Sequence, residues 1–277
     1  MTIRRNALLL APSTAVVAIV FALPLLFLVV ISFWSVKNFR LRPDFTFTAW
    51  ERFATEYGTL TLYTLAVGLT AGIICTAVGL AFAYAARFKA GRFGDALIIA
   101  VLITLFGGYL VKVYAWKIIL GADGIINSAL IALGLTKAPL DWLIYSRGTV
   151  IVALVNFLLP FAILPIYAAM RNISDTTLEA ARDLGASPTQ SFVRVVLPLV
   201  STGVYSAFAF CFLIAAGDYV TPMLLGGTSG SMLGQFVALE FSTRFNWPAG
   251  AAMSLGLLAS CVFLLGVVAL LMKARAK

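Results

Sequence analysis

Residues 179–198 read EAARDLGASPTQSFVRVVLP, a polar passage in an otherwise apolar chain. Long hydrophobic runs precede and follow it, so the passage joins two apolar segments. It contains a glycine, a Ser-Pro pair and a final proline, which are residues that begin and end short helices. The passage therefore predicts a short folded connection between two helices that lie in an apolar solvent.

The composition indicates that this solvent is lipid. The 277 residues are 62% hydrophobic and 11% charged, and the mean hydropathy is +1.02. A soluble domain carries about 25% charged residues. The net charge of +9 is then better explained by cationic cytoplasmic loops than by nucleic-acid binding, which we do not expect.

The residue types exclude several kinds of chemistry. The sequence has no histidine, which removes the commonest general base and metal ligand, and we expect no metal site. Cys75, Cys211 and Cys261 lie far apart in apolar runs and are predicted to be small core or lipid-facing residues. The chain contains no Gly-x-x-x-x-Gly-Lys-Ser/Thr motif, so we expect no ATP binding by that route.

Six apolar runs are long enough to cross a bilayer, which takes about 20 residues. The first run follows two arginines, as a cleaved signal peptide would, but its apolar part is too long and predicts a retained helix. In the second run, Gly68, Gly72 and Gly79 favour close helix packing. The sequence thus predicts an all-α polytopic membrane protein with one transmembrane domain over 1–277. The predicted spans are 7–34, 60–86, 96–120, 149–170, 197–216 and 249–272.

The distribution of charge predicts how the chain is oriented. With six spans, both termini lie on the same side of the membrane. Lys and Arg outnumber Asp and Glu in the segments on that side and balance them on the other. By the positive-inside rule both termini are cytoplasmic, and so is the polar passage. On the outer side, segments 121–147 and 221–246 contain apolar stretches too short to cross, which predict re-entrant or interfacial helices.

The polar passage, extended to 175–198, carries the signals of two short helices. Residues 176–179, TTLE, predict a capping box, and Gly185 predicts the left-handed residue that ends a helix. Residues 187–190, SPTQ, predict a second capped start, and Pro198 predicts a stop or kink. The alternative is a solvated loop in which the glutamate only caps its helix.

This passage resembles the EAA loop of permease subunits of bacterial ABC importers. That loop has Glu-Ala-Ala, then three residues and Gly, then nine residues and Ile-x-Leu-Pro. Here EAA occupies 179–181, Gly185 follows, and Val-Val-Leu-Pro at 195–198 has valine in place of the usual isoleucine. Further stretches, such as LVKVYAWKIIL at 110–120 and GDYVTPMLLGG at 217–227, resemble the spermidine/putrescine (polyamine) branch of this family.

The resemblance implies a type I ABC importer permease (MetI-like) fold in the bacterial inner (plasma) membrane. It also implies three partners: a second permease, expected to be a different chain, a dimer of ATPase subunits, and a periplasmic substrate-binding protein. ATP and Mg would be bound by the ATPase, so this chain would be a transport subunit with no cofactor and no catalytic residues. By the same resemblance, the residues that couple to the ATPase are Glu179, Ala180, Ala181, Gly185, Leu197 and Pro198. Arg182 joins them because it lies three residues after Glu179, where the two charges can dock together into another protein.

A small cationic substrate, such as putrescine or spermidine, would need carboxylates and aromatic faces along its path. The candidate residues for this path are Asp218, Tyr219, Glu240, Trp247, Tyr114, Trp116 and Asn156. Structural alternatives stay open: Asp218 as a helix cap, Trp247 as an interface anchor, and Asn156 as a hydrogen-bond partner of a neighbouring helix. For Lys112 and Lys117 in the third span two alternatives stay open: they snorkel outward, or they pair with Asp218 or Glu240 in a closed state.

Other functions also stay open on the sequence alone. Permeases related to this family carry other small polar solutes, such as opines, aminophosphonates or amino-acid-like compounds. A self-contained secondary transporter would need its own ion-coupling residues and usually internal repeats, and the sequence has no clear repeat. An intramembrane enzyme is disfavoured because the spans contain no Ser-Lys or paired-Asp signature.

Overall fold

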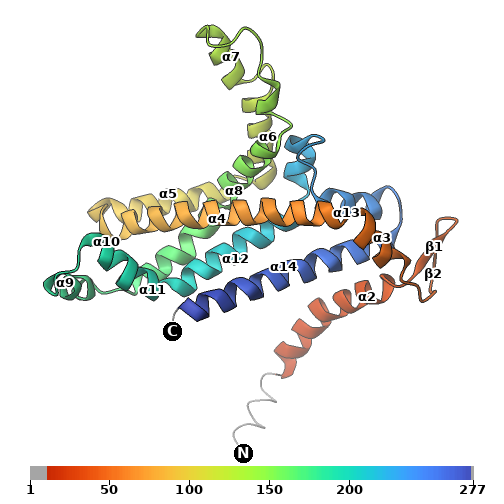
Figure 1. Ribbon diagram of the computed structural model, residues 1–277, viewed down its shortest axis with the longest axis horizontal. Helices are drawn as coiled ribbons and strands as arrows, with labels where there is room; N and C mark the ends of the chain where they lie inside the picture. The colour runs from red at the N-terminus through yellow and green to blue at the C-terminus, as the bar shows by residue number, and fades with distance from the viewer. Residues whose placement is uncertain (1–10, 276–277) are drawn as a thin grey trace, which may run out of the picture. The chain divides into compact units, whose positions relative to one another are not determined.

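The computed structural model describes residues 11–275, with side chains up to residue 272, so residues 7–10 of the first predicted span and the two arginines before them lie outside it. The described chain is helical apart from one two-stranded hairpin (Figure 1). Residues 11–17 are also helical. The other elements are η1 (Ala18–Ala22), α2 (Leu23–Ile31), β1 (Ser35–Lys37), β2 (Arg40–Arg42), α3 (Thr48–Glu56), α4 (Gly58–Phe88), η2 (Gly91–Phe93), α5 (Gly94–Phe106), α6 (Tyr109–Leu120), α7 (Ile125–Ala132), η3 (Asp141–Leu143), α8 (Arg147–Arg171), α9 (Asp175–Asp183), α10 (Pro188–Ser191), η4 (Phe192–Val196), α11 (Leu197–Leu199), α12 (Ser201–Gly217), η5 (Pro222–Gly226), α13 (Leu233–Ser242) and α14 (Trp247–Arg275).

Where the sequence predicts one domain, contacts divide the described chain into two compact units. The first unit contains the chain up to Thr61 together with Phe236–Ser260, and the second contains Leu62–Gln235 and the residues from Cys261 onward. The boundaries between the units fall inside α4, α13 and α14 and do not coincide with loops.

The first unit combines the N-terminal helix, the β1–β2 hairpin and α3 with parts of α13 and α14. The two strands are antiparallel, with Val36 opposite Leu41. The turn between them consists of Asn38 and Phe39, both at positive φ (53° and 57°), the backbone that two-residue hairpins require. Aromatic rings then pack between the hairpin and α3, with Phe33 stacked on Phe45 at 5.0 Å between centroids.

The core of the second unit is formed by α4, α8 and α12. Figure 1 shows α4 lying along α8 and α12, and glycines on α4 make this close approach possible. A Cβ atom at Gly79 would lie 3.0 Å from Ala162 Cβ on α8, and one at Gly68 would lie 3.1 Å from Ala216 Cβ on α12. The predicted role of these glycines in close helix packing is confirmed.

Five helices are long and apolar enough to cross a membrane, and one bent pair is a further candidate. The five are Ala11–Ile31, Gly58–Phe88, Tyr109–Ala132, Arg147–Arg171 and Trp247–Met272, and the bent pair is Pro188–Leu199 with Ser201–Gly217. The predicted fifth span, 197–216, is therefore not a straight helix, because the pair bends by 70° at the junction.

The third predicted span, 96–120, also differs from the structure. α5 ends at Phe106, and Gly107 and Gly108 have extended backbone with ψ of 105° and 143°. Glycine gives up the most backbone entropy in a helix, so a Gly-Gly pair favours a break there. The candidate span begins at Tyr109 and includes α7, the short helix that the sequence predicts from its apolar stretch.

The segments that leave the core of the second unit are held by polar contacts. α6 and α7 extend away from α4, α8 and α12 (Figure 1). Asn127 on α7 is fully buried, donates to Gly121 O at 2.9 Å and accepts from Leu140 N at 2.8 Å. Its amide therefore fixes the turn before α7 to the chain that follows it.

Candidate functional site

The first candidate site, residues 175–198, begins with α9. The N-cap of this helix is Ser174, whose Oγ accepts a hydrogen bond from Thr177 N at 3.3 Å. The predicted capping box at residues 176–179 is therefore wrong, because the helix starts earlier and the hydroxyl of Thr176 bonds Ser174 Oγ at 2.8 Å. Glu179 lies beyond the first turn of α9 and does not cap it.

α9 ends as the sequence predicts. Gly185 has φ of +80°, a backbone that side chains other than glycine rarely adopt. Its N–H donates to Arg182 O at 2.8 Å, and Ala186 N donates to Ala181 O at 3.0 Å. This pair of bonds is the Schellman motif, which satisfies the last carbonyl groups of the helix.

The second half of the segment starts with the predicted capping box, which is confirmed. Gln190 N donates to Ser187 Oγ at 3.3 Å, and Ser187 N donates to Gln190 Oε1 at 2.9 Å, with Pro188 in the first helical turn. The predicted stop at Pro198 is displaced: α11 continues past it to Leu199, and Val200, with φ of −96° and ψ of 5°, separates α11 from α12.

The two faces of α9 differ sharply. Leu178 is 7% exposed and belongs to the hydrophobic core of the second unit. Glu179, Ala180 and Arg182 are exposed, and Leu184, at the helix end, is 90% exposed. The side chain of Glu179 forms no hydrogen bond or ion pair within the described residues. The outer face of α9 is thus a small, mixed apolar and charged surface that none of the described residues covers.

A second polar site forms where α12 ends, at Asp218. Its Oδ1 accepts hydrogen bonds from Tyr109 Oη at 2.6 Å and from Val220 N at 3.0 Å, and its Oδ2 accepts one from Thr221 N at 3.2 Å. The Tyr109 hydroxyl also bonds Thr221 Oγ1 at 2.8 Å. Asp218 therefore caps the backbone N–H groups that follow α12, which is one of the alternatives left open by the sequence. Tyr109 of α6 also orients its carboxylate.

The Asp218 carboxylate lines a cavity of about 450 Å³ in the second unit. The walls are mainly apolar and aromatic, and include Tyr109, Phe157 and Tyr219. The rings of Tyr109 and Phe157 lie 4.6 Å apart, and Lys112 Nζ lies 5.7 Å from the centroid of Phe157. One carboxylate beside several ring faces can hold an ammonium group.

Comparison with known proteins gives the chain its family. It is 36% identical over 201 residues to the spermidine/putrescine transport system permease protein PotB of Haemophilus influenzae, covering 73% of this chain and 70% of that one. The chain belongs to this family of ABC importer permeases. The permease is also 31% identical to PotB of Escherichia coli, over 73% of each chain, and 34% identical to the inner membrane ABC transporter permease protein YdcU of Escherichia coli, over 69% of this chain and 64% of that one. No protein-family model matches it.

Solved structures show the fold. The permease superposes on a chain of a bacterial alginate ABC transporter, solved in complex with an alginate pentasaccharide-bound periplasmic protein, with a TM-score of 0.76 at 15% identity, covering 100% of this chain and 97% of that one. It matches a chain of the MetNI methionine ABC transporter with a TM-score of 0.53 at 18% identity, over 78% of this chain and 92% of that one. The permease therefore has the ABC importer permease fold.

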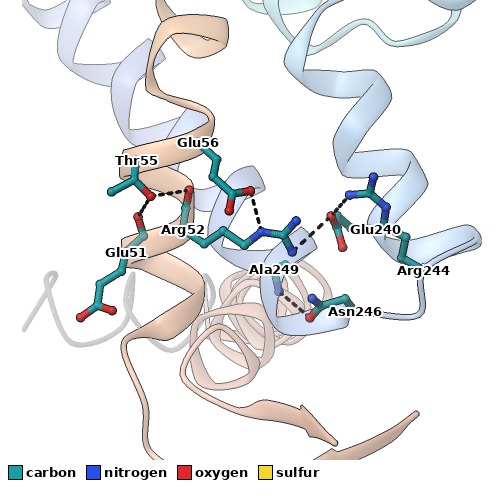
Figure 2. Close-up of polar contacts among 8 residues, drawn as sticks. All are labelled: Glu51, Arg52, Thr55, Glu56, Glu240, Arg244, Asn246 and Ala249. Carbon is teal, nitrogen blue, oxygen red and sulfur yellow. Dashed lines mark hydrogen bonds and ion pairs between the residues drawn. The ribbon is translucent and has the colours of Figure 1, made fainter. Parts of the chain in front are cut away.

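Glu240, a predicted substrate-path residue, is paired with two arginines of its own chain. In the first unit, Glu240 is fully buried, and its Oε1 lies 2.7 Å from Arg244 Nη1 and 3.9 Å from Arg52 Nη1. Figure 2 shows Arg52 between Glu56 and Glu240. The hydrogen bond to Glu56 raises the pKa of Arg52, and the bond to Glu240 raises that of Arg244. Glu240 is thus an internal counter-ion that ties α13 to α3.

Replacing Glu240 by Gln is expected to lower the stability of the permease by about 1–3 kcal/mol, because two guanidinium groups lose their shared counter-ion. A thermal unfolding measurement in detergent checks this. Glu51→Gln, which changes an exposed carboxylate on α3, is the matched control and should change stability by less than about 0.5 kcal/mol. Equal unfolding temperatures for the two variants would contradict this role of Glu240.

The candidates Tyr114, Trp116 and Asn156 are not among the residues that line the Asp218 cavity, and Trp247 belongs to the first unit. Tyr114 and Trp247 are half-exposed, and Trp116 packs on α6 against the small hydrophobic cluster around Val113. The side chain of Asn156 is exposed on α8 and forms no hydrogen bond to a neighbouring helix among the described residues. The expected closed-state ion pairs of the two lysines of α6 are also absent from the described residues.

Sequence reasoning missed the residues that complete both polar sites. Tyr109 was not a candidate, although it follows the Gly-Gly break directly, and a tyrosine at the start of a membrane helix is a signal worth weighing. Arg52 was not a candidate because α3 contains other charges and only the fold brings it to Glu240. Thr221 bonds both Tyr109 and Asp218. Its place three residues after Asp218 is a local sequence signal, because such a spacing lets the carboxylate cap the N–H of Thr221.

Proposed function

We propose that this permease is the transmembrane subunit of an ATP-driven importer of a small cationic solute, a polyamine such as putrescine or spermidine. Its relatives are named as spermidine/putrescine permeases. It would work with a second permease, a dimer of ATPase subunits and a periplasmic substrate-binding protein. It would itself hold no cofactor, because ATP and Mg would be bound by the ATPase, and it would be a transport subunit without catalytic residues.

The observation that carries this proposal is the uncovered outer face of α9. Glu179, Ala180 and Arg182 point to solvent, Leu184 is 90% exposed, and Glu179 is not needed as a cap. This face joins small, apolar and charged side chains on a helix whose ends are capped within the segment, so a partner protein can cover it without rearranging the helix. We assign this surface to the ATPase, with Gly185 setting the angle between the two short helices and Leu197 and Pro198 leading into the membrane.

The substrate part of the proposal rests on the Asp218 cavity. Three hydrogen bonds hold the carboxylate in place, and aromatic rings line the space beside it. An ammonium group gains from both a fixed carboxylate and ring faces. We place Asp218 and Tyr219 on the substrate path, with Tyr109 and Phe157 as its aromatic wall. We leave Glu240 out, because it is already paired.

Asn156 supports a path on the exposed side of α8. An amide within a membrane span costs free energy if it faces lipid. Its exposure in the isolated chain is therefore better explained if the second permease or a water-filled path lies against this face. Tyr114, Trp116 and Trp247 stay secondary candidates for the substrate path, because their ring faces can attract an ammonium group.

We further propose six spans, with both termini and the 175–198 segment in the cytoplasm of a bacterial cell and the chain in its inner membrane. Four of the long helices supply spans by themselves, α5 with α6 supplies the third span and α12 supplies the fifth, and the positive-inside rule supplies the direction. The predicted outer segment 221–246 would then hold η5 and α13, and residues 125–135 would hold α7.

The test is reconstitution of the permease with its second permease, ATPase and binding protein, followed by uptake of labelled spermidine and putrescine. Uptake should require ATP, the ATPase and the binding protein. If the binding protein instead prefers an opine, an aminophosphonate or an amino acid, the importer stands and the polyamine assignment is wrong. Uptake by the permease without any ATPase would indicate a secondary transporter and contradict the proposal.

A further inference from the structure

The segment 175–198 is attached to α4 as well as to the two helices that it joins along the chain. Arg87, near the end of α4, donates from Nη2 to Asp175 Oδ1 at 3.0 Å and to Ile173 O at 3.2 Å. Its guanidinium carbon also lies 4.9 Å from the centroid of the Phe88 ring. A single side chain of α4 thus holds both the first residue of α9 and the turn before it.

Aromatic and apolar packing reinforces this attachment. Tyr84 on α4 packs edge-on against Phe192 of η4, with 5.1 Å between ring centroids. Leu178 of α9 and Ala83 of α4 are both buried in the hydrophobic core of the second unit. The side chains of α4 therefore contact both halves of the segment, before and after Gly185.

α4 is suited to carry a displacement over a long distance. It is one helix from Gly58 to Phe88 with no proline, and its glycines bring it close to α8 and α12. Toward its opposite end, the buried Thr64 accepts a hydrogen bond at Oγ1 from Leu233 N, the first residue of α13, at 2.9 Å. From Thr64 to Arg87 the helix rises roughly 35 Å, which exceeds the roughly 30 Å of a bilayer core.

We propose that α4 carries movement of the 175–198 segment across the membrane to the start of α13, and that Arg87 is the positioning residue that attaches the segment to α4. The inference rests on the proposed function, because it presumes that an ATPase moves the segment. α8 and α12 receive the same movement through the chain itself. Arg87 transmits the movement to α4 as well, so that α4, α8 and α12 move together.

The experiment uses the complete importer in proteoliposomes and measures uptake and ATP hydrolysis in the same preparation. Arg87→Ala should leave the ATPase bound while uptake per ATP hydrolysed falls about three- to tenfold, the size expected for losing one partly exposed charged hydrogen-bonding group. Arg87→Lys, which keeps the charge with one donor group, should be intermediate. Arg92→Ala, which removes an exposed cation after α4, should match the unmodified importer.

A charge exchange separates positioning from general damage. Arg87→Asp combined with Asp175→Arg should recover at least half of the uptake per ATP that Arg87→Asp alone loses, because the pair is restored with reversed polarity. Unchanged uptake per ATP in Arg87→Ala overturns the inference, and so does a charge exchange that recovers nothing. If the unmodified importer takes up no polyamine, the proposed function fails, which is a result distinct from either outcome at Arg87.

Discussion

Polyamine uptake by an Asp218→Asn importer should fall at least tenfold while the ATPase still copurifies with the permease. A hydrogen bond to a charged group contributes about 1.5–3 kcal/mol, and a neutral amide cannot compensate an ammonium group. The asparagine keeps one oxygen for the backbone N–H groups of Val220 and Thr221, which now hold the carboxylate. The local fold should therefore persist. Initial rates of labelled spermidine uptake in proteoliposomes measure the effect.

Two further variants define this result. Asp123→Asn removes an exposed carboxylate elsewhere in the second unit and should leave uptake unchanged. Asp218→Glu keeps the charge and should retain part of the activity. Uptake within twofold of the unmodified importer in Asp218→Asn would remove Asp218 from the substrate path and leave it as a helix-end cap.

Gly185→Val should lower ATP-dependent uptake at least tenfold and reduce the amount of ATPase that copurifies with the permease. Gly185 has φ of +80°, and a β-branched residue in the left-handed region costs about 1–2 kcal/mol or more. Among the described residues, apart from its two neighbours in the chain, nothing lies within 4 Å of the place where a Cβ would stand, so the cost comes from the backbone and not from a clash. The turn between α9 and α10 should open in response.

The matched control for this variant is Gly185→Asn, since asparagine tolerates the left-handed conformation best among the non-glycine residues. It should keep most of the uptake and most of the bound ATPase. If the valine and asparagine variants lose activity equally, a side chain itself interferes at this position, and the conformational argument is wrong. Normal copurification and uptake in the valine variant would contradict the coupling role of the turn.

Local chemistry decided which parts of the 175–198 segment the sequence could predict. The box at 187–190 and the turn at Gly185 depend on residues within a few positions of one another, and both are confirmed. The first cap failed because Ser174, Thr176 and Thr177 are all plausible caps, and their hydroxyls in fact bond one another. Sequence rules identify a cap region but do not rank hydroxyl groups that compete within it.

The limits were larger for the membrane helices and the polar sites. Glycine is common in membrane helices, so the pair at 107–108 gave no clear warning that the third span would break. Tyr109 and Asp218 lie 109 residues apart, and no periodicity joins positions at that distance. Glu240 carried a correct signal, an acidic residue in an apolar run, but its partner Arg52 is supplied by tertiary structure.

The caps of the 175–198 segment have a mechanical consequence. Its helix starts and its central turn are satisfied by hydrogen bonds that begin and end within residues 174–190. The segment can therefore be displaced as a rigid piece without leaving any of these groups unpaired. The resistance to such a displacement comes instead from the buried Leu178, the Tyr84–Phe192 ring contact and the Arg87 bonds. These few contacts set the stiffness of the joint, and small changes in them should tune how much work each ATP delivers to the membrane helices.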